Sequence, residues 1–173
     1  NDIMGTEDGL AKYPYIRESR RIKALFTVLE EHVGKRQRMD ITGQNAKEVK
    51  AKNFEDSVGI GYYHIDLHPS SGGDNYIDFD SLQFQIPLGS LIPEQMENIF
   101  PANKNIGTTH ITNGCYRLHP VEWSIGESVG ELIPFLKDKG ISPQTMYRNK
   151  QLIKEFQEQI KQNGIETEWP NEN

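Results

Sequence analysis

Residues 57–68, with the sequence SVGIGYYHIDLH, decide the first part of the fold. They precede a turn-forming run, PSSGGDN, at 69–75, and we predict that they form an extended strand. Successive residues of a strand point to opposite faces of a sheet. One face of this segment therefore carries Val58, Ile60, Tyr62, His64, Asp66 and His68.

Further strands are predicted on both sides of this segment. Apolar and polar residues alternate over 20–28, as in a half-buried strand. Short strands are also predicted at 76–79, 82–86 and 98–101. Residues 34–53 are polar and lysine-rich and contain few apolar residues, so we predict a solvated, mobile segment there.

The last third of the chain is predicted to be helical. Apolar residues recur at helical spacing over 129–136 and again over 152–160, and Gly140 and Gly164 follow as stop signals. Pro134 is expected to kink the first helix. The sequence thus predicts an α+β fold, in which an antiparallel or mixed β-sheet from the N-terminal two thirds is followed by a C-terminal pair of helices.

The composition argues against several classes of protein. The 173 residues suffice for one domain, and the mean hydropathy of -0.67, without a long apolar run, disfavours a membrane protein. The formal net charge of -6 disfavours binding to nucleic acid, which needs a basic face. The single cysteine cannot form an internal disulfide, and the first residues do not form a signal peptide. We therefore expect a cytoplasmic protein with neither a membrane nor a nucleic acid as partner.

The first candidate site is the face that carries His64, Asp66 and His68. Two imidazoles and a carboxylate at alternate positions of a strand project together, so they could form a hydrogen-bonded structural group, line a substrate pocket or bind a metal. A metal site needs a further ligand that the local sequence does not supply, and none is predicted. A stand-alone, non-enzymatic module that binds a ligand or a metal through this face is the alternative function.

The second candidate site is the polar stretch at 107–120, which we predict to be a loop that runs into a helix. Loops rich in hydroxyl, amide and imidazole groups commonly bind ligands, and a helix N-terminus favours an anion. A nucleophilic Cys115 assisted by His110 or His119 is a further alternative, although no third group that would orient the histidine is apparent. The sequence contains no glycine-rich motif of the kind that binds phosphate.

Four stretches in order give the chain a resemblance to a bacterial family of FAD-dependent oxidoreductases. They are YPYIRESRRI at 13–22, DSVGIGYYHIDLHP at 56–69, FQIPLGSLIP at 84–93 and NIFPANKNIGTTHITNGCYRLHPVEWSIGESVG at 98–130. In the last stretch the family's Ala-Gly pair is Ala102-Asn103, and its closing GEAAG is GESVG at 126–130. Together the four stretches cover most of residues 13–140.

The resemblance implies that the cofactor is FAD and the substrate a small organic molecule. In this family a Rossmann-type domain that precedes such a segment binds the ADP half of FAD. This chain would then be the C-terminal fragment of a larger two-domain flavoprotein, and its first residue, which is not methionine, is consistent with that. Residues 1–100 would be strands of a substrate domain, and residues 101–173 would return to the FAD domain. We expect that the chain alone does not retain FAD.

The resemblance also implies roles for single residues. Arg117 takes the position of the signature arginine, and the candidate catalytic residues are Arg117, His110 and His119. The candidate FAD contacts are Asn103, Lys104 and Asn105 near the ribityl chain, and Pro120, Val121 and Glu122 near the flavin pyrimidine edge. His64, Asp66 and His68 would line the substrate pocket.

Overall fold

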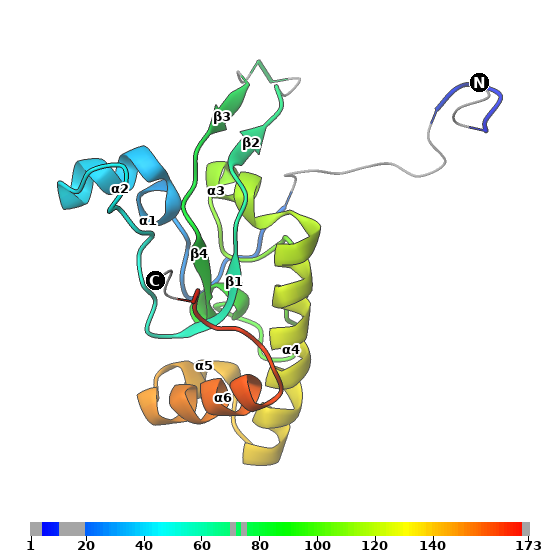
Figure 1. Ribbon diagram of the computed structural model, residues 1–173. Coiled ribbons are helices and arrows are strands. Elements are labelled where there is room, and N and C mark those ends of the chain that lie inside the picture. Colours follow the sequence, from blue (N-terminus) through cyan, green and yellow to red (C-terminus); the bar gives the residue numbers. More distant parts are fainter. Residues whose placement is uncertain (1–4, 11–19, 70–71, 74–75, 171–173) are drawn as a thin grey trace.

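The chain between residues 57 and 87 forms one long hairpin that is interrupted near its middle. The computed structural model describes residues 5–10, 20–69, 72–73 and 76–170. β1 (Ser57–Gly61) pairs antiparallel with β4 (Phe84–Pro87), and β2 (Ile65–Leu67) pairs antiparallel with β3 (Ile77–Phe79). Figure 1 shows the β2–β3 pair continuing the β1–β4 pair. The sheet therefore consists of two short ladders in place of one continuous sheet.

The predicted strand at 57–68 is divided because residues 62–64 leave the ladder. The backbone carbonyl of Tyr63 accepts a hydrogen bond from the hydroxyl of Ser81, which takes the place of a ladder bond. Gly61 ends β1 in a tight contact, since a Cβ added there would lie 2.5 Å from the ring of Phe84. The alternation of side chains therefore does not continue unbroken from Val58 to His68.

The predicted strand at 20–28 is an extended segment without a ladder. It forms isolated bridges, Ala24 with Pro93 and Val28 with Thr108. Its backbone N–H groups donate to several partners: Leu25 to Ile92 O, Phe26 to Gly89 O and Val28 to Gly107 O. The segment is thus clamped between residues 88–93 and 106–108. The strand predicted at 98–101 is absent from the described structure, because residues 94–99 are exposed and take part in no ladder.

The helical region is larger than the predicted pair. It contains α3 (His110–Tyr116), α4 (His119–Lys139), α5 (Pro143–Tyr147) and α6 (Lys150–Gln162), and the short 3₁₀ helix η1 (Leu88–Leu91) follows β4. The prediction of a loop at 107–120 is wrong for α3, where Thr109 and Thr112 cap each other: Thr109 Oγ1 accepts from Thr112 N at 3.0 Å, and Thr112 Oγ1 accepts from Thr109 N at 2.9 Å.

The polar segment at 34–53 begins with a helix. α1 (Glu30–Val33) is followed at once by α2 (Lys35–Thr42), and Figure 1 shows this helical pair beside the hairpin. The return from α2 is held by Lys52 N, which donates to His32 O at 2.8 Å, and by the buried side chain of Val49. Residues 41–48 are exposed, and greater mobility of this segment stays a prediction.

The core lies between the hairpin and the helices α3, α4 and α6. The rings of Phe84 and Tyr116 stack with centroids 4.3 Å apart, and the hydroxyl of Tyr116 donates to Gln85 O at 2.7 Å. Leu132 and Phe156 bring α4 and α6 into the same core. Figure 1 shows α4 running alongside the hairpin, with α5 and α6 below it. None of the described helices is long and apolar enough to cross a membrane.

His32 holds the start of α1 from within an aromatic pocket. Its ring lies 5.5 Å from that of Phe26 and 5.6 Å from that of Phe54 between centroids, and its Nδ1 atom accepts a hydrogen bond from Leu29 N at 3.0 Å. Burial is the main cause that lowers the pKa of His32, and the positive charge of Lys52 is the second, because both disfavour the imidazolium form.

We expect the free energy of unfolding to fall as the pH drops below 6.5, the ordinary pKa of histidine. Because the pKa of His32 is lower in the folded chain, the unfolded chain takes up this proton first and acid favours unfolding. His32→Asn keeps an acceptor for the N–H of Leu29 but cannot be protonated, so its unfolding free energy should depend less on pH. Urea denaturation near neutrality and under mildly acidic conditions measures this, and identical pH dependence of the two proteins would refute the role of His32.

Candidate functional site

Arg117 connects the helical region to the hairpin. It lies at the C-cap of α3, just before α4, and only 7% of its surface is exposed. Its Nη2 atom donates to the backbone carbonyl of Asp66 on β2 at 2.9 Å and lies 3.6 Å from Asp66 Oδ2. A buried guanidinium with a carboxylate partner is a fixed positive charge that holds β2 against the α3–α4 junction.

Asp66 also faces His68. The distance from His68 Nε2 to Asp66 Oδ2 is 3.9 Å, and the side chain of His68 is 51% exposed, against 16% for Asp66. The ring of His68 lies edge-on to that of Tyr76, with centroids 5.9 Å apart. Arg117 and His68 thus both approach Asp66 Oδ2, one from the buried side and one from the surface, and the three residues are called here the Arg117–Asp66–His68 relay.

His64 has a different partner from the one its spacing suggested. Its Nδ1 atom lies 3.7 Å from Asp78 Oδ1, and the hydroxyl of Tyr76 donates to Asp78 Oδ2 at 3.1 Å. Asp66 and Asp78 are directly opposite each other in the β2–β3 ladder, an arrangement that costs stability unless the charges are compensated. Asp66 therefore lies beside His68, and Asp78 beside His64. Arg117 adds a positive charge next to Asp66, the better buried of the two carboxylates.

The geometry does not support the metal-binding alternative. Within the part of the chain that the structure describes, no group of three or more histidine, cysteine or acidic side chains could hold a metal ion. Asp78 and Tyr76 are the site residues that sequence reasoning missed. Tyr76 and Asp78 are two residues apart, so both side chains lie on the same face of the extended chain. This relation to the His64–His68 segment could be recognised only once the two strands were known to pair.

The residues expected near FAD gather at the N-terminus of α4. Lys104 N lies 3.3 Å from Glu122 Oε1, and Lys104 O accepts from Asn113 Nδ2 at 2.8 Å. Asn103 and Asn105 are exposed beside Lys104. Val121, in contrast, is 1% exposed and belongs to the core. The structure therefore brings residues 103–105 and Glu122 together, whereas the side chain of Val121 points away from that surface.

The remaining candidates differ in accessibility. His110 and His119 are both exposed, at the first positions of α3 and α4. Cys115 is fully buried, its Sγ donates to Thr112 O at 3.3 Å, and burial raises the pKa of its thiol. Since the thiolate is the nucleophilic form and must be accessible, Cys115 is a packing residue and the Cys–His alternative is not supported.

Comparison with known families decides between the remaining functions. A sequence model of the family described as "FAD dependent oxidoreductase" matches residues 3–160. The chain belongs to this family. No curated protein and no solved structure shows significant similarity to it. The predicted resemblance to FAD-dependent oxidoreductases is thus confirmed. The helices and small antiparallel sheets of the structure confirm the α+β class, and the stretch at 13–19 lies outside the described residues.

The N-terminus of α4 is the part of the described chain that suits the cofactor of the FAD-dependent oxidoreductase family. α4 has 21 residues, and the side chain of its N-cap Leu118 accepts no hydrogen bond from the first turn. The N–H groups there suit an electron-rich edge such as that of a flavin ring. The described residues form no glycine-rich turn for a diphosphate. They therefore fit the ring end of FAD and not its diphosphate end.

Proposed function

We propose that this chain supplies the substrate side and the flavin-ring side of an FAD-dependent oxidoreductase that acts on a small organic substrate. In this proposal a Rossmann-type domain outside the present sequence holds the ADP half of FAD, and the chain alone does not retain the cofactor. The observation that supports it most is the Arg117–Asp66–His68 relay, which joins the hairpin to the helix junction that the family's closing signature forms.

The relay suits the transfer of a proton. FAD, when bound, supplies the acceptor for a hydride, so the substrate must also release a proton to a base. The imidazole of His68 is half-exposed and its Nε2 atom lies 3.9 Å from the carboxylate of Asp66, and histidine is the side chain that most often acts as a general base. Arg117 is buried and acts as a positioning residue, because it holds the carboxylate of Asp66 beside His68.

The flavin contacts are proposed at the N-terminus of α4. Asn103, Lys104, Asn105, Pro120 and Glu122 would contact the ribityl chain and the pyrimidine edge, while Val121 anchors the turn in the core. Uncapped N–H groups and the positive end of the α4 dipole favour negative charge at that edge. His110 and His119 are further proposed proton carriers, since both are exposed on the first turns of their helices.

The FAD-loaded enzyme tests the role of His68 with a matched control on the same hairpin. His68→Asn should slow flavin reduction by an alcohol or amine substrate about a hundredfold, because it removes the base. His64→Asn should leave the rate within about twofold, although His64 is similarly exposed and also has a carboxylate partner. Anaerobic stopped-flow reduction measures both. Equal effects of the two substitutions, or none from either, would refute the assignment.

A further inference from the structure

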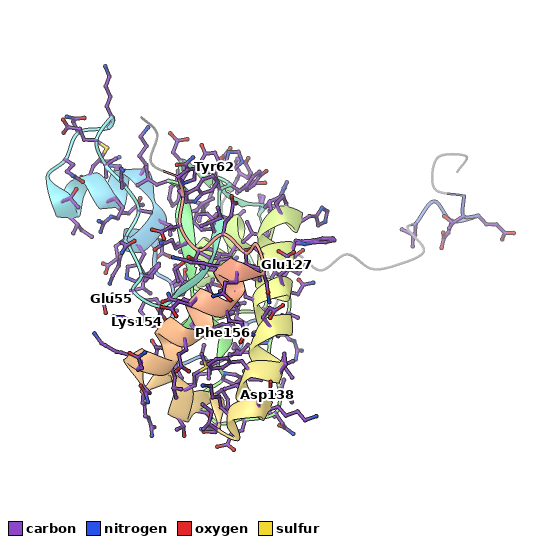
Figure 2. All side chains as sticks on the ribbon, turned by 60° about the horizontal axis from the view of Figure 1, so that its bottom comes forward. Glu55, Tyr62, Glu127, Asp138, Lys154 and Phe156 are labelled. Atoms are coloured by element: carbon purple, nitrogen blue, oxygen red, sulfur yellow. The ribbon has the colours of Figure 1, made fainter. Side chains whose placement is uncertain are left out.

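A groove lies beside the end of β1, between α4 and the segment that follows α6. It has a volume of about 640 Å³, in the range of small-molecule sites. Its aromatic walls are Tyr62, Trp123 and Trp169, and its rim carries Glu127 and Glu166. In Figure 2, Glu127 lies on α4, on the side where the chain leaves α6. This surface is called the aromatic groove below.

The aromatic groove is built by fixed elements. Two glycines of β1 allow α4 to approach, since a Cβ added at Gly59 would lie 2.5 Å from Ser124 Oγ. The wall after α6 is held by Trp169, whose Nε1 donates to Phe84 O at 3.0 Å, and by Thr167, whose carbonyl accepts from Ser57 Oγ at 2.6 Å. The groove therefore exists before any ligand arrives, which lowers the cost of binding.

The side chains of the groove expose aromatic faces to solvent. Trp123 is 72% exposed and Tyr62 61% exposed, among the most exposed large hydrophobic residues of the described chain. Neither position contributes to the core, so packing does not account for these rings. Exposed rings that wall a hollow are typical of sites that bind a flat or cationic group.

The charges of the groove select among ligands. Within the described residues, neither Glu127 nor Glu166 forms an ion pair, and no lysine, arginine or histidine lines the groove. Carboxylates beside aromatic faces attract cations and repel phosphates and carboxylates. We propose that the aromatic groove binds a small organic cation with a quaternary or protonated amine. Apart from Pro120 on its rim, it contains none of the residues of the proposed flavin and relay sites, and the inference does not depend on that function.

The two tryptophans of the chain, Trp123 and Trp169, both line the groove, so tryptophan fluorescence, excited selectively over tyrosine, reports on this site alone. Choline, a quaternary amine, should change the emission saturably, with a midpoint of about 1–10 mM at constant ionic strength. The uncharged tert-butyl analogue of choline has the same shape and should bind at least about tenfold more weakly. Trp123→Ala removes an exposed wall and should abolish the change without loss of fold.

A charge-matched pair of variants separates the groove from the general charge of the protein. Glu127→Gln with Glu166→Gln should weaken choline binding about fivefold or more. Asp138→Asn with Glu158→Gln removes two exposed acidic groups elsewhere and should leave the midpoint within about twofold. Equal binding of the uncharged analogue, equal weakening in both double variants, or no saturation with choline would each overturn the proposal.

Discussion

Replacing Gly107 with alanine is expected to lower the free energy of unfolding by about 3 kcal/mol. The added Cβ would collide with the backbone carbonyl of Phe26 and lie 2.6 Å from the Cβ of Ala24. The backbone cannot move aside, because Gly107 N donates to Ser90 O at 2.8 Å and Gly107 O accepts from Val28 N at 2.9 Å. Gly107 therefore sets the distance between the extended segment at 20–28 and the start of the helical region.

The control is Gly130→Ala on the exposed side of α4. A Cβ at Gly130 would meet no atom within 4 Å, and alanine favours a helix interior by up to about 1 kcal/mol over glycine. Urea denaturation should therefore show a large loss of stability for the first variant and a small gain for the second. A change of less than about 0.5 kcal/mol in Gly107→Ala would contradict the clamped arrangement of the segment at 20–28.

Local patterns predicted strands and a turn in the region of the hairpin, but neither their pairing nor the way the remaining segments are held. The strands around Ile65 and Phe84 follow from alternation and from the turn-forming residues between them. The same alternation at 20–28 predicted a strand, but there the N–H groups of Leu25, Phe26 and Val28 find acceptors in three separate places. These acceptors lie more than 60 residues away along the chain, so the local pattern of apolar and polar residues could not predict the hydrogen bonds.

The helical region was underestimated for a related reason. The polar residues at 107–116 suggested a loop, yet Thr109 and Thr112 satisfy each other as a cap and Asn113 donates to Lys104 O. A threonine at the third helical position is not the usual Glu or Gln of a capping box. At α2 most residues have high helix propensity, but none is buried, so no apolar periodicity marked the helix; Arg38 Nε donates to Lys50 O and ties it to the returning chain.

The candidate site could be predicted as a set of residues but not as a set of pairs. Spacing placed His64, Asp66 and His68 together, and the family resemblance singled out Arg117. That Arg117 meets Asp66, and that His64 turns to Asp78, follows only from the docking of α3 on β2 and the register of the β2–β3 ladder. The partners lie far apart along the chain and leave no local signal.

Arg117→Met is expected to lower the free energy of unfolding by about 3 kcal/mol. The substitution leaves the carboxylate of Asp66, whose side chain is 16% exposed, without its closest cation and opposite Asp78. Asp66→Asn should cost less, because Arg117 keeps its hydrogen bond to the backbone carbonyl of residue 66 and the repulsion between residues 66 and 78 is removed. In a double-mutant cycle the two changes should be coupled by about 1–2 kcal/mol.

An exposed ion pair serves as the comparison for that cycle. Lys139 Nζ and Glu155 Oε2 are only 2.6 Å apart, but their side chains are 42% and 39% exposed. Their coupling in the same experiment should not exceed about 0.5 kcal/mol, because solvent screens exposed charges. Equal coupling energies for the two pairs would contradict the view that Arg117 is a buried anchor of the β2–β3 hairpin.

The flavin content of the protein tests the central claim most directly. Two samples are compared: the protein purified from the cells that naturally make it, and the 173-residue chain produced alone. Visible absorbance gives the FAD content per polypeptide of the first, and the second is titrated with FAD. Because the described residues suit the ring end of FAD and form no diphosphate cradle, the account predicts one FAD per polypeptide in the cellular protein and no stoichiometric binding by the chain alone. A cellular protein without flavin, or a 173-residue chain that binds FAD stoichiometrically by itself, would contradict it.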